Sequence, residues 1–375
     1  YLTGNPQITF FKVVYRRHTN FSMEAIEQTW NGGDGTSSGA AAAGRCTATI
    51  SRNGDLVHRM YLELVGTSGN TVSANPGSFG IKDIEVEIGG QKIDKHTGDW
   101  MNVWSSLSEP NPTGRVGQPG TTNSGTLFQN MSGMGNCLNV AQASRLFVPL
   151  QFWFCRNPGL ALPLIALQYH EVKVILNHDW STVFDGAFTQ NKLWCDYIYL
   201  DTDERRRFAQ VSHEYLIEQV QSMTTGATDL SDKSVDLNFN HPVKELVFST
   251  GDGSGATSDG IFAAGGTLQL KLNGHDRFAA RDSRYFSRTQ IWQHHSGAGG
   301  LVAGTAADGA FNDAVGVYSF ALKPEEHQPS GTCNFSRIDN AQLVGTGTSR
   351  LTRIFAVNYN VLRIMSGMGG LAYSN

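Results

Sequence analysis

Charged side chains are scarce in this sequence, and neither sign of charge dominates. Asp, Glu, Lys and Arg make up 17% of the 375 residues, against about 25% in ordinary soluble domains. The formal net charge is −4, whereas proteins that bind nucleic acid phosphates show a basic surface. The run Arg205, Arg206 and Arg207 follows acidic residues at positions 201, 203 and 204, which indicates a solvated or salt-bridged linker. Direct binding of nucleic acid is therefore not expected.

Paired cysteines and long apolar runs are also lacking. The five cysteines are an odd number, lie far apart and form no C-x-x-C motif, so free thiols in a reducing compartment are expected. The longest apolar run, residues 160–167, is interrupted by Pro163 and is too short to span a bilayer. No signal peptide is recognisable, and the sequence begins with Tyr1 rather than Met.

One pattern of alternating apolar residues followed by a turn occurs twice. In the first copy, alternation over residues 84–88 leads into Gly89-Gly90. In the second copy, alternation over residues 268–272 leads into Asn273-Gly274. Alternation is typical of a half-buried strand, and these dipeptides are typical of two-residue hairpin turns. The sequence therefore predicts two β-hairpins about half the chain length apart.

Other landmarks recur in the same order. Each predicted hairpin is followed by apolar residues at helical spacing, at 100–107 with Asp99 as the expected N-cap and at 285–292 with Asp282 as the expected N-cap. Tryptophans in these stretches are expected to lie in the core. Turn residues also precede an apolar strand twice, at 53–55 and at 240–242. Such a set of repeats favours the duplication of one β-domain.

Stretches rich in Gly, Ser, Ala and Thr separate the predicted strands. They run over residues 31–44, 108–136, 250–266 and 296–314. Loops of this length are usually functional surface structures or disordered segments. Their low charge favours ordered protrusions over disordered tails.

The predicted fold class is all-β, with two tandem jelly-roll β-sandwiches, a few short helices and long loops. Residues 1–203 form the first predicted jelly roll, residues 204–212 a linker and residues 213–375 the second jelly roll. The pattern does not give the order of the strands. An immunoglobulin-like sandwich therefore stays open as the alternative.

Recognisable catalytic motifs are missing from the sequence. It contains no G-x-x-x-x-G-K-[ST] loop, no G-x-S-x-G elbow and no H-E-x-x-H helix. His294-His295 and His170-Glu171 are the adjacent metal-ligand types, and neither has a third ligand at a recognisable spacing. His170 is expected to be a structural histidine. Carboxylate pairs such as Asp201/Asp203 and Glu325/Glu326 occur, as in any chain of this length, so we expect no catalytic, cofactor or metal site.

Three N-x-[ST] triplets are candidate sites of N-glycosylation. They begin at Asn20, Asn130 and Asn334. Asn130 lies in a predicted loop, whereas Asn20 and Asn334 border predicted strands. Asn130 is therefore the candidate glycan acceptor.

The most specific signal is a set of long blocks that span the chain. The blocks are YLTGNPQITFFK at 1–12, SRNGDL at 51–56, IGGQKIDKH at 88–96, PGLALPLIALQYHEV at 158–172, HEYLIEQ at 213–219, PSGTCNFSRIDN at 329–340 and NYNVLRIMSGMGGLAY at 358–373. In these blocks the sequence resembles the major capsid proteins of nucleocytoplasmic large DNA viruses, closest to the algal-virus (phycodnavirus) type. The glycine-rich loops depart from this resemblance.

The resemblance implies a double jelly roll that forms homotrimers of pseudo-hexagonal outline, which tile an icosahedral shell. It implies minor capsid and penton proteins as partners and an internal membrane as an indirect one. The implied place is the virion capsid, assembled in the host cytoplasm. Residues 1–17 are expected near the base of the trimer, and their deletion is expected to leave soluble trimers that do not join the lattice.

Two other classes of protein remain as alternatives. A carbohydrate-binding jelly-roll module needs clustered aromatic and acidic residues in its loops, and residues 31–44 contain one Asp and no aromatic residue. Residues 296–314 contain two Asp and only Phe311 as an aromatic residue. An enzyme of the cupin kind needs a His/Glu metal set, which the sequence does not offer. Both alternatives are disfavoured.

Overall fold

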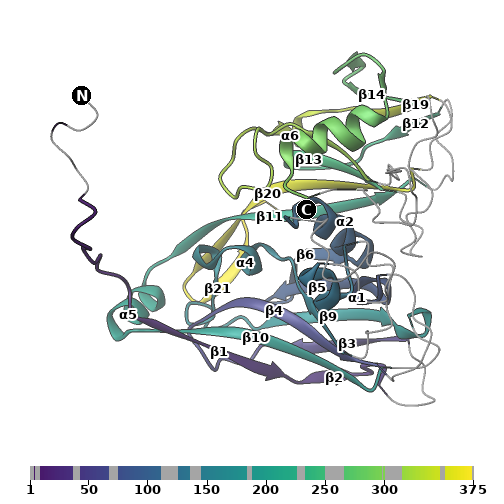
Figure 1. Ribbon diagram of the computed structural model, residues 1–375. Coiled ribbons are helices and arrows are strands. Elements are labelled where there is room, and N and C mark those ends of the chain that lie inside the picture. The colour runs from purple at the N-terminus through teal and green to yellow at the C-terminus, as the bar shows by residue number, and fades with distance from the viewer. Residues whose placement is uncertain are drawn as a thin grey trace.

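The computed structural model describes residues 4, 9–36, 43–66, 75–110, 126–135, 145–183, 188–225, 233–249, 266–297, 299, 315–346 and 351–373. Within these ranges the chain is built mainly from antiparallel strands, which form four sheets (Figure 1). Two sheets come from the first half of the chain and two from the second half.

The first half forms one β-sandwich. Its first sheet has the order β1 (Phe21–Gln28), β10 (Gln190–Leu200), β4 (Leu56–Val65) and β7 (Arg145–Pro149), with β8 (Leu162–Pro163) beside β4. Its second sheet has the order β2 (Trp30–Gly32), β3 (Ala43–Thr49), β9 (Val172–Asp179), β5 (Ile81–Ile88) and β6 (Gln91–Thr97).

The second half repeats this arrangement. One sheet has the order β11 (His213–Thr224), β20 (Arg353–Met365), β13 (Pro242–Ser249) and β17 (Val315–Ser319), with β18 (Cys333–Asn334) beside β13 and β21 (Met368–Leu371) beside β20. The other has the order β12 (Lys233–Asp236), β19 (Ala341–Thr346), β14 (Thr267–Leu272) and β15 (His275–Asp276), with β16 (Arg281–Asp282) beside β14.

The strand order confirms the jelly-roll prediction and excludes the immunoglobulin-like alternative. In both repeats the first strand pairs with the last long strand of its sandwich, which in turn pairs with a strand from the middle of the repeat. That middle strand, β4 or β13, has an irregular register against its neighbour in both copies. A bulge kept at the same place supports one duplicated unit.

Both predicted hairpins are present. Gly89 and Gly90 have φ of 58° and 85°, and Asn273 and Gly274 have φ of 51° and 77°. Two successive residues of positive φ are what a type I′ turn requires, and that turn matches the twist of the paired strands. Local turn chemistry therefore sets the register of β5 with β6 and of β14 with β15.

Both predicted helix caps are wrong. Helix α2 (Gly98–Ser108) is capped by Thr97, whose hydroxyl accepts the Trp100 N–H at 3.2 Å. Asp99 lies inside the first turn, where a carboxylate also favours the helix, and it pairs with Arg353 at 3.0 Å. Asp282 belongs to β16, and its carboxylate accepts the Arg284 N–H at 2.9 Å.

The second helical stretch differs from the prediction in type and in exposure. It is a π-helical turn (Tyr285–Thr289) that continues into α6 (Gln290–His294). Trp292 is 81% exposed, whereas Trp100 and Trp104 of α2 are buried. The core prediction is therefore correct for the first repeat and wrong for Trp292.

Ordered elements occur inside the predicted loops and linker. Helix α3 (Leu127–Ser132) lies within the predicted loop 108–136, where Thr126 and Gln129 form a capping box. The predicted linker overlaps helix α5 (Thr202–Gln210), which is capped by Asp201. The predicted protrusions at 37–42, 111–125, 136, 250–265, 298 and 300–314 lie outside the described residues.

The remaining helices are short. They are α1 (Pro76–Phe79), α4 (Trp153–Arg156) and 3₁₀ turns at Pro158–Leu160, Trp180–Thr182 and Phe335–Arg337. Among the described residues, no helix is both long and apolar enough to cross a bilayer. Four of the cysteines are free thiols, as the sequence predicts, and Cys137 lies outside the described residues.

The two sandwiches share a buried boundary. Trp100 and Trp104 stack on each other at 5.6 Å, and Trp100 lies 5.2 Å from Phe355 of β20. Val247, Val317 and other apolar residues of the second repeat complete this cluster. Helix α2 of the first repeat therefore packs against the β11–β20–β13–β17 sheet of the second repeat.

Candidate assembly surfaces

The candidate glycan acceptor, Asn130, lies in a helix and not in a loop. The sequence prediction of a loop is wrong because the capping box at Thr126 starts α3 within a stretch of weak helix formers. The Asn130 side chain is exposed, and its amide donates to the Thr126 carbonyl at 2.9 Å. Asn20 directly precedes β1, and Asn334 is in β18, where its side chain accepts the Ser336 N–H. Glycosylation of Asn130 stays a prediction.

His170 is a structural histidine, as predicted. It stands just before β9, and the Gly369 N–H donates to its Nδ1 at 3.1 Å. Gly369 belongs to β21 of the second repeat. This hydrogen bond therefore links the first repeat to the second.

His295 forms ion pairs with two glutamates, which its spacing from them in the sequence does not predict. Its Nε2 lies 3.0 Å from Glu245 and its Nδ1 lies 3.1 Å from Glu325, and its side chain is fully buried. Burial lowers the pKa of His295, but the two carboxylates outweigh this effect and raise the pKa to about 9. A protonated imidazole has no lone pair for a metal ion. In the described ranges, no group of three or more His, Cys, Asp and Glu could hold a metal.

This histidine stands at the boundary between the repeats. Its ring meets Trp104 of α2 edge-on, with centroids 6.3 Å apart. The next residue, Ser296, donates its hydroxyl to the Ser108 carbonyl at the end of α2, and the Gly297 N–H donates to Leu107. The buried ion pairs therefore hold the segment that lies along the end of α2.

A second buried ion cluster crosses the same boundary. Glu218 of β11 lies 2.8 Å from Arg156 of α4 and 2.9 Å from Lys244 of β13. The guanidinium of Arg156 also lies 4.3 Å from the ring centre of Trp104. The Lys244 side chain has no exposed surface. Because one carboxylate neutralises cations from both repeats, its removal would leave buried charge without a counterion.

The electrostatics of Glu218 follow from this arrangement. Burial alone raises the pKa of the carboxyl, but the hydrogen bond with His327 and the charges of Lys244 and Arg156 outweigh it and lower the pKa to about 2. Sequence reasoning missed this cluster. Its only signal was the pair Lys244-Glu245 inside an otherwise apolar strand.

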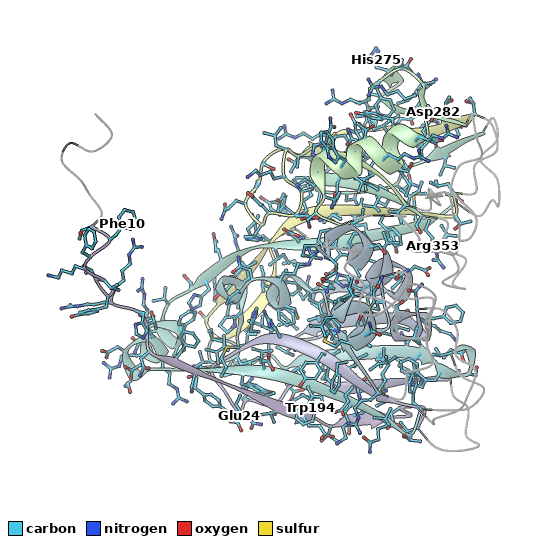
Figure 2. The ribbon with its side chains drawn as sticks, viewed as in Figure 1. Phe10, Glu24, Trp194, His275, Asp282 and Arg353 are labelled. Carbon is cyan, nitrogen blue, oxygen red and sulfur yellow. The ribbon has the colours of Figure 1, made fainter. Side chains whose placement is uncertain are left out.

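The segment before β1 exposes a large apolar surface. Residues 9–20 leave the body next to α5 (Figure 1), and Phe10 stands clear of the two sandwiches (Figure 2). The side chains of Phe10, Phe11 and Val13 are 90%, 99% and 98% exposed. The same stretch contains Lys12, two arginines and no acidic residue. Apolar exposure on this scale marks an interaction site.

A second apolar surface surrounds the turn between β20 and β21. Tyr169, Met365 and Met368 are 76%, 55% and 52% exposed. The Tyr169 N–H donates to the carbonyl of Gly367 in this turn at 3.0 Å. Both repeats therefore contribute to one exposed apolar patch.

These features define a structural subunit built for assembly: a duplicated jelly roll, fastened across a buried boundary, with apolar side chains exposed at one end. The comparisons with known proteins agree with this class. Two family descriptions match consecutive parts of the chain, "Major capsid protein N-terminus" over residues 9–201 and "Large eukaryotic DNA virus major capsid protein" over residues 204–370. The chain therefore belongs to the major capsid protein family of large eukaryotic DNA viruses.

Individual relatives match over nearly their whole length. The chain is 51% identical to the major capsid protein of Pyramimonas orientalis virus, covering 100% of this chain and 96% of that protein. It is 40% identical to the major capsid protein of Paramecium bursaria Chlorella virus 1, again covering 100% and 96%. Among solved structures, PBCV-1 VP54 matches with a TM-score of 0.76 and 37% identity, covering 98% of this chain and 100% of that chain. The Faustovirus major capsid protein shares the fold at 13% identity, with a TM-score of 0.63.

Proposed function

We propose that this capsid protein forms a homotrimer of pseudo-hexagonal outline, and that these trimers tile an icosahedral shell. One observation carries the proposal: the two halves of the chain have the same strand order. Three such chains supply six comparable lobes, and a near-hexagonal block packs into a closed lattice. Residues 1–203 and 213–375 are the two lobes of this proposal, and residues 204–212 connect them.

The role is structural, with no catalytic activity. The subunit is placed in the virion capsid and is assembled in the host cytoplasm. Its further partners are minor capsid and penton proteins, with an internal membrane beneath as an indirect neighbour and with no direct contact to nucleic acid. The apolar surface at residues 9–20 and around the β20–β21 turn supports a contact with other proteins at this end.

The first test is the solution mass by light scattering after size exclusion. We expect a stable species of three times 40.8 kDa. A chain that stays monomeric at high concentration would contradict the proposal.

Deletion of residues 1–17 tests the role of the exposed segment. We expect the shortened protein to form trimers that do not join into sheets or shells, because its apolar contacts between trimers are lost. The matched variant Phe10→Ser with Phe11→Ser keeps the length and removes two exposed aromatic side chains, and it should show the same defect. Electron microscopy of assemblies is the measurement, and normal shells from the shortened protein would refute this role.

A further inference from the structure

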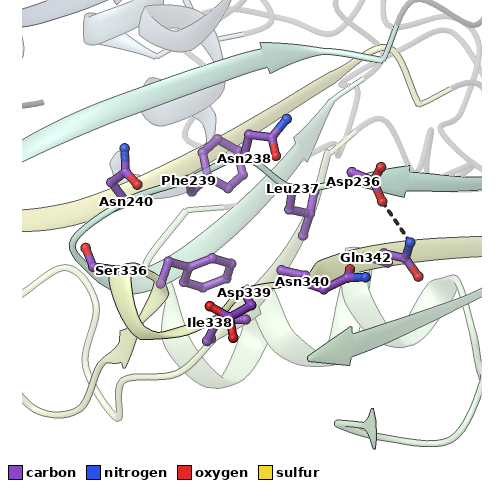
Figure 3. A pocket seen from close by; sticks show the side chains of 12 residues that line it. Asp236, Leu237, Asn238, Phe239, Asn240, Ser336, Ile338, Asp339, Asn340 and Gln342 are labelled. Carbon is purple, nitrogen blue, oxygen red and sulfur yellow. Dashed lines mark hydrogen bonds between the residues drawn. The ribbon is translucent and has the colours of Figure 1, made fainter. Parts of the chain in front are cut away.

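A polar pocket opens at one end of the second jelly roll (Figure 3). It has a volume of about 480 Å³ and lies between residues 236–240 and residues 335–342. Two carboxylates, Asp236 and Asp339, line it together with several amides, and its lining contains no Lys or Arg. Asp236 accepts a hydrogen bond from Gln342 at 2.8 Å, and Asp339 is exposed.

The register of the strands identifies the equivalent place in the first jelly roll. The Gly89 N–H donates to the Glu171 carbonyl at 2.9 Å, and the Asn273 N–H donates to the Asn340 carbonyl at 2.6 Å. Gly89 and Asn273 hold the same position in the two hairpin turns, so Glu171 corresponds to Asn340. The residue before each is then equivalent as well, which pairs His170 with Asp339.

Backbone bonds at the edge of the pocket give the same alignment. The Ile50 N–H donates to Val172, and the Leu237 N–H donates to Ala341. Val172 and Ala341 directly follow Glu171 and Asn340 in the sequence. The pocket of the second repeat is therefore the counterpart of the surface around residues 50–54 and 167–172.

In the first repeat the second repeat contacts this surface. The β20–β21 turn lies on it, with Tyr169 bonded to Gly367 and His170 bonded to Gly369. The contact is close, because a Cβ added at Gly367 would lie 2.6 Å from the Tyr169 ring. The element that follows the last long strand of one repeat thus docks on the other repeat.

The equivalent element of the first repeat is α5. It follows β10, which has the place in its sheet that β20 has in the second repeat. Helix α5 contains three arginines, of which Arg205 forms an ion pair with Asp55 at 2.9 Å. Arg206 and Arg207 are exposed and form no ion pair within the part of the chain that the structure describes. The element of the first repeat that corresponds to the β20–β21 turn therefore presents two exposed cations.

We propose that α5 of one copy docks in the Asp339 pocket of a second copy and sets Arg206 and Arg207 against its carboxylates. This inference rests on the proposed trimer and names one of its contacts. In a ring of six lobes, the relation of the second lobe to the first within a chain recurs between the first lobe and the second lobe of the next chain. The pocket has two acids and no base, and α5 offers two unpaired cations, so the charges are complementary.

Charge reversal with rescue tests the contact. Asp339→Arg should weaken the association of copies by at least about tenfold, because it sets like charges against each other. Adding Arg206→Asp and Arg207→Asp to the same chain should restore much of the association. Asp282→Arg is the matched control, because Asp282 is an exposed carboxylate of the same repeat. In the strand register Asp282 lies opposite Thr267, which is at the end of β14 far from the pocket. The readout is the dilution at which light scattering shows the trimer to dissociate.

A cross-link separates contacts between copies from contacts within one chain. Chains with Arg206→Cys and chains with Asp339→Cys are mixed at a dilution where their trimers dissociate, concentrated again and oxidised, and a disulfide-linked dimer is expected only in the mixture. If the wild type is a monomer, both the proposed function and this inference fail. If the wild type is a trimer whose dissociation Asp339→Arg leaves unchanged and the mixture yields no dimer, the docking is overturned while the trimer stands.

Discussion

The two jelly rolls share strand order and hairpin turns, but they differ at the end that carries α5 and the β20–β21 turn. In the first repeat this end is in contact with the second repeat of the same chain, through hydrogen bonds of Tyr169 and His170. In the second repeat the equivalent position is an exposed aspartate in an open pocket. In the proposed docking, α5 of another copy occupies the place that the β20–β21 turn has in the first repeat. His170 of the first repeat binds a backbone N–H of the second repeat. Asp339 at the equivalent position is a carboxylate, which attracts cations.

The same comparison holds for the boundary between the repeats. The larger apolar cluster belongs to the first repeat, and it also includes Ile217, Leu362 and Ile364 of the second. The second repeat has a smaller cluster of its own. It also meets the first through α2, through the ion pair of Glu218 with Arg156 and through the contact of the His295 ring with Trp104. We infer that the stability of the second repeat depends more on this boundary than the stability of the first.

The largest expected effect comes from Glu218→Gln. This change keeps the shape of the side chain but leaves the buried Lys244 and the partly buried Arg156 without their carboxylate. We expect a loss of about 3–5 kcal/mol in the free energy of unfolding, measured by chemical denaturation. The matched control is Glu214→Gln on the same strand, whose exposed pair with Arg363 is worth less than about 1 kcal/mol. Similar small losses for both variants would show that the boundary cluster does not stabilise the second repeat.

The next effect is a dependence on pH that comes from His295. Its pKa is about 9 in the folded chain and about 6.5 when unfolded. A raised pKa in the folded state stabilises the protein fully below pH 6.5, and this contribution is lost as the pH rises toward 9. The size is roughly 3 kcal/mol, from about 1.4 kcal/mol per pH unit.

Urea denaturation at several pH values between 6 and 9.5 measures this dependence. His295→Gln should be less stable at pH 6 and should show a much flatter profile over this window. A wild-type profile as flat as that of the variant would contradict a charged His295 between Glu245 and Glu325.

Much of the fold follows from local signals in the sequence. Alternation at residues 84–88 and 268–272, with Gly-Gly and Asn-Gly turns, predicted both hairpins because pleat and turn geometry are local properties. Duplication followed from the same landmarks. The caps were harder, since Thr97 and Asp99 are both good capping residues and the choice depends on the direction in which β6 delivers the chain.

The boundary and the pocket could not be read from the sequence for a different reason. Glu218, Lys244 and Arg156 come from three separate elements, and His295 meets glutamates 50 and 30 residues away. The packing of one repeat on the other brings Arg156 to Glu218, whereas the fold of the second repeat brings the other partners together. The equivalence of the pocket residue Asp339 with His170 follows only from backbone hydrogen bonds in the structure. Long blocks of resemblance indicated the family, but they carry no information on contacts.

The smallest effect distinguishes the end of the first repeat, which the second repeat contacts, from the open end of the second repeat. His170→Ala removes a bond between the repeats of one chain, so it should cost about 1–2 kcal/mol at any protein concentration. Asp339→Ala removes an exposed carboxylate, so it should change the stability of the dissociated chain by less than about 0.5 kcal/mol. Its effect should grow as the concentration rises, because a group that binds another copy stabilises the protein by mass action. Thermal unfolding at several protein concentrations measures both, and equal shifts for the two variants at every concentration would mean that the two ends do not differ in what they bind.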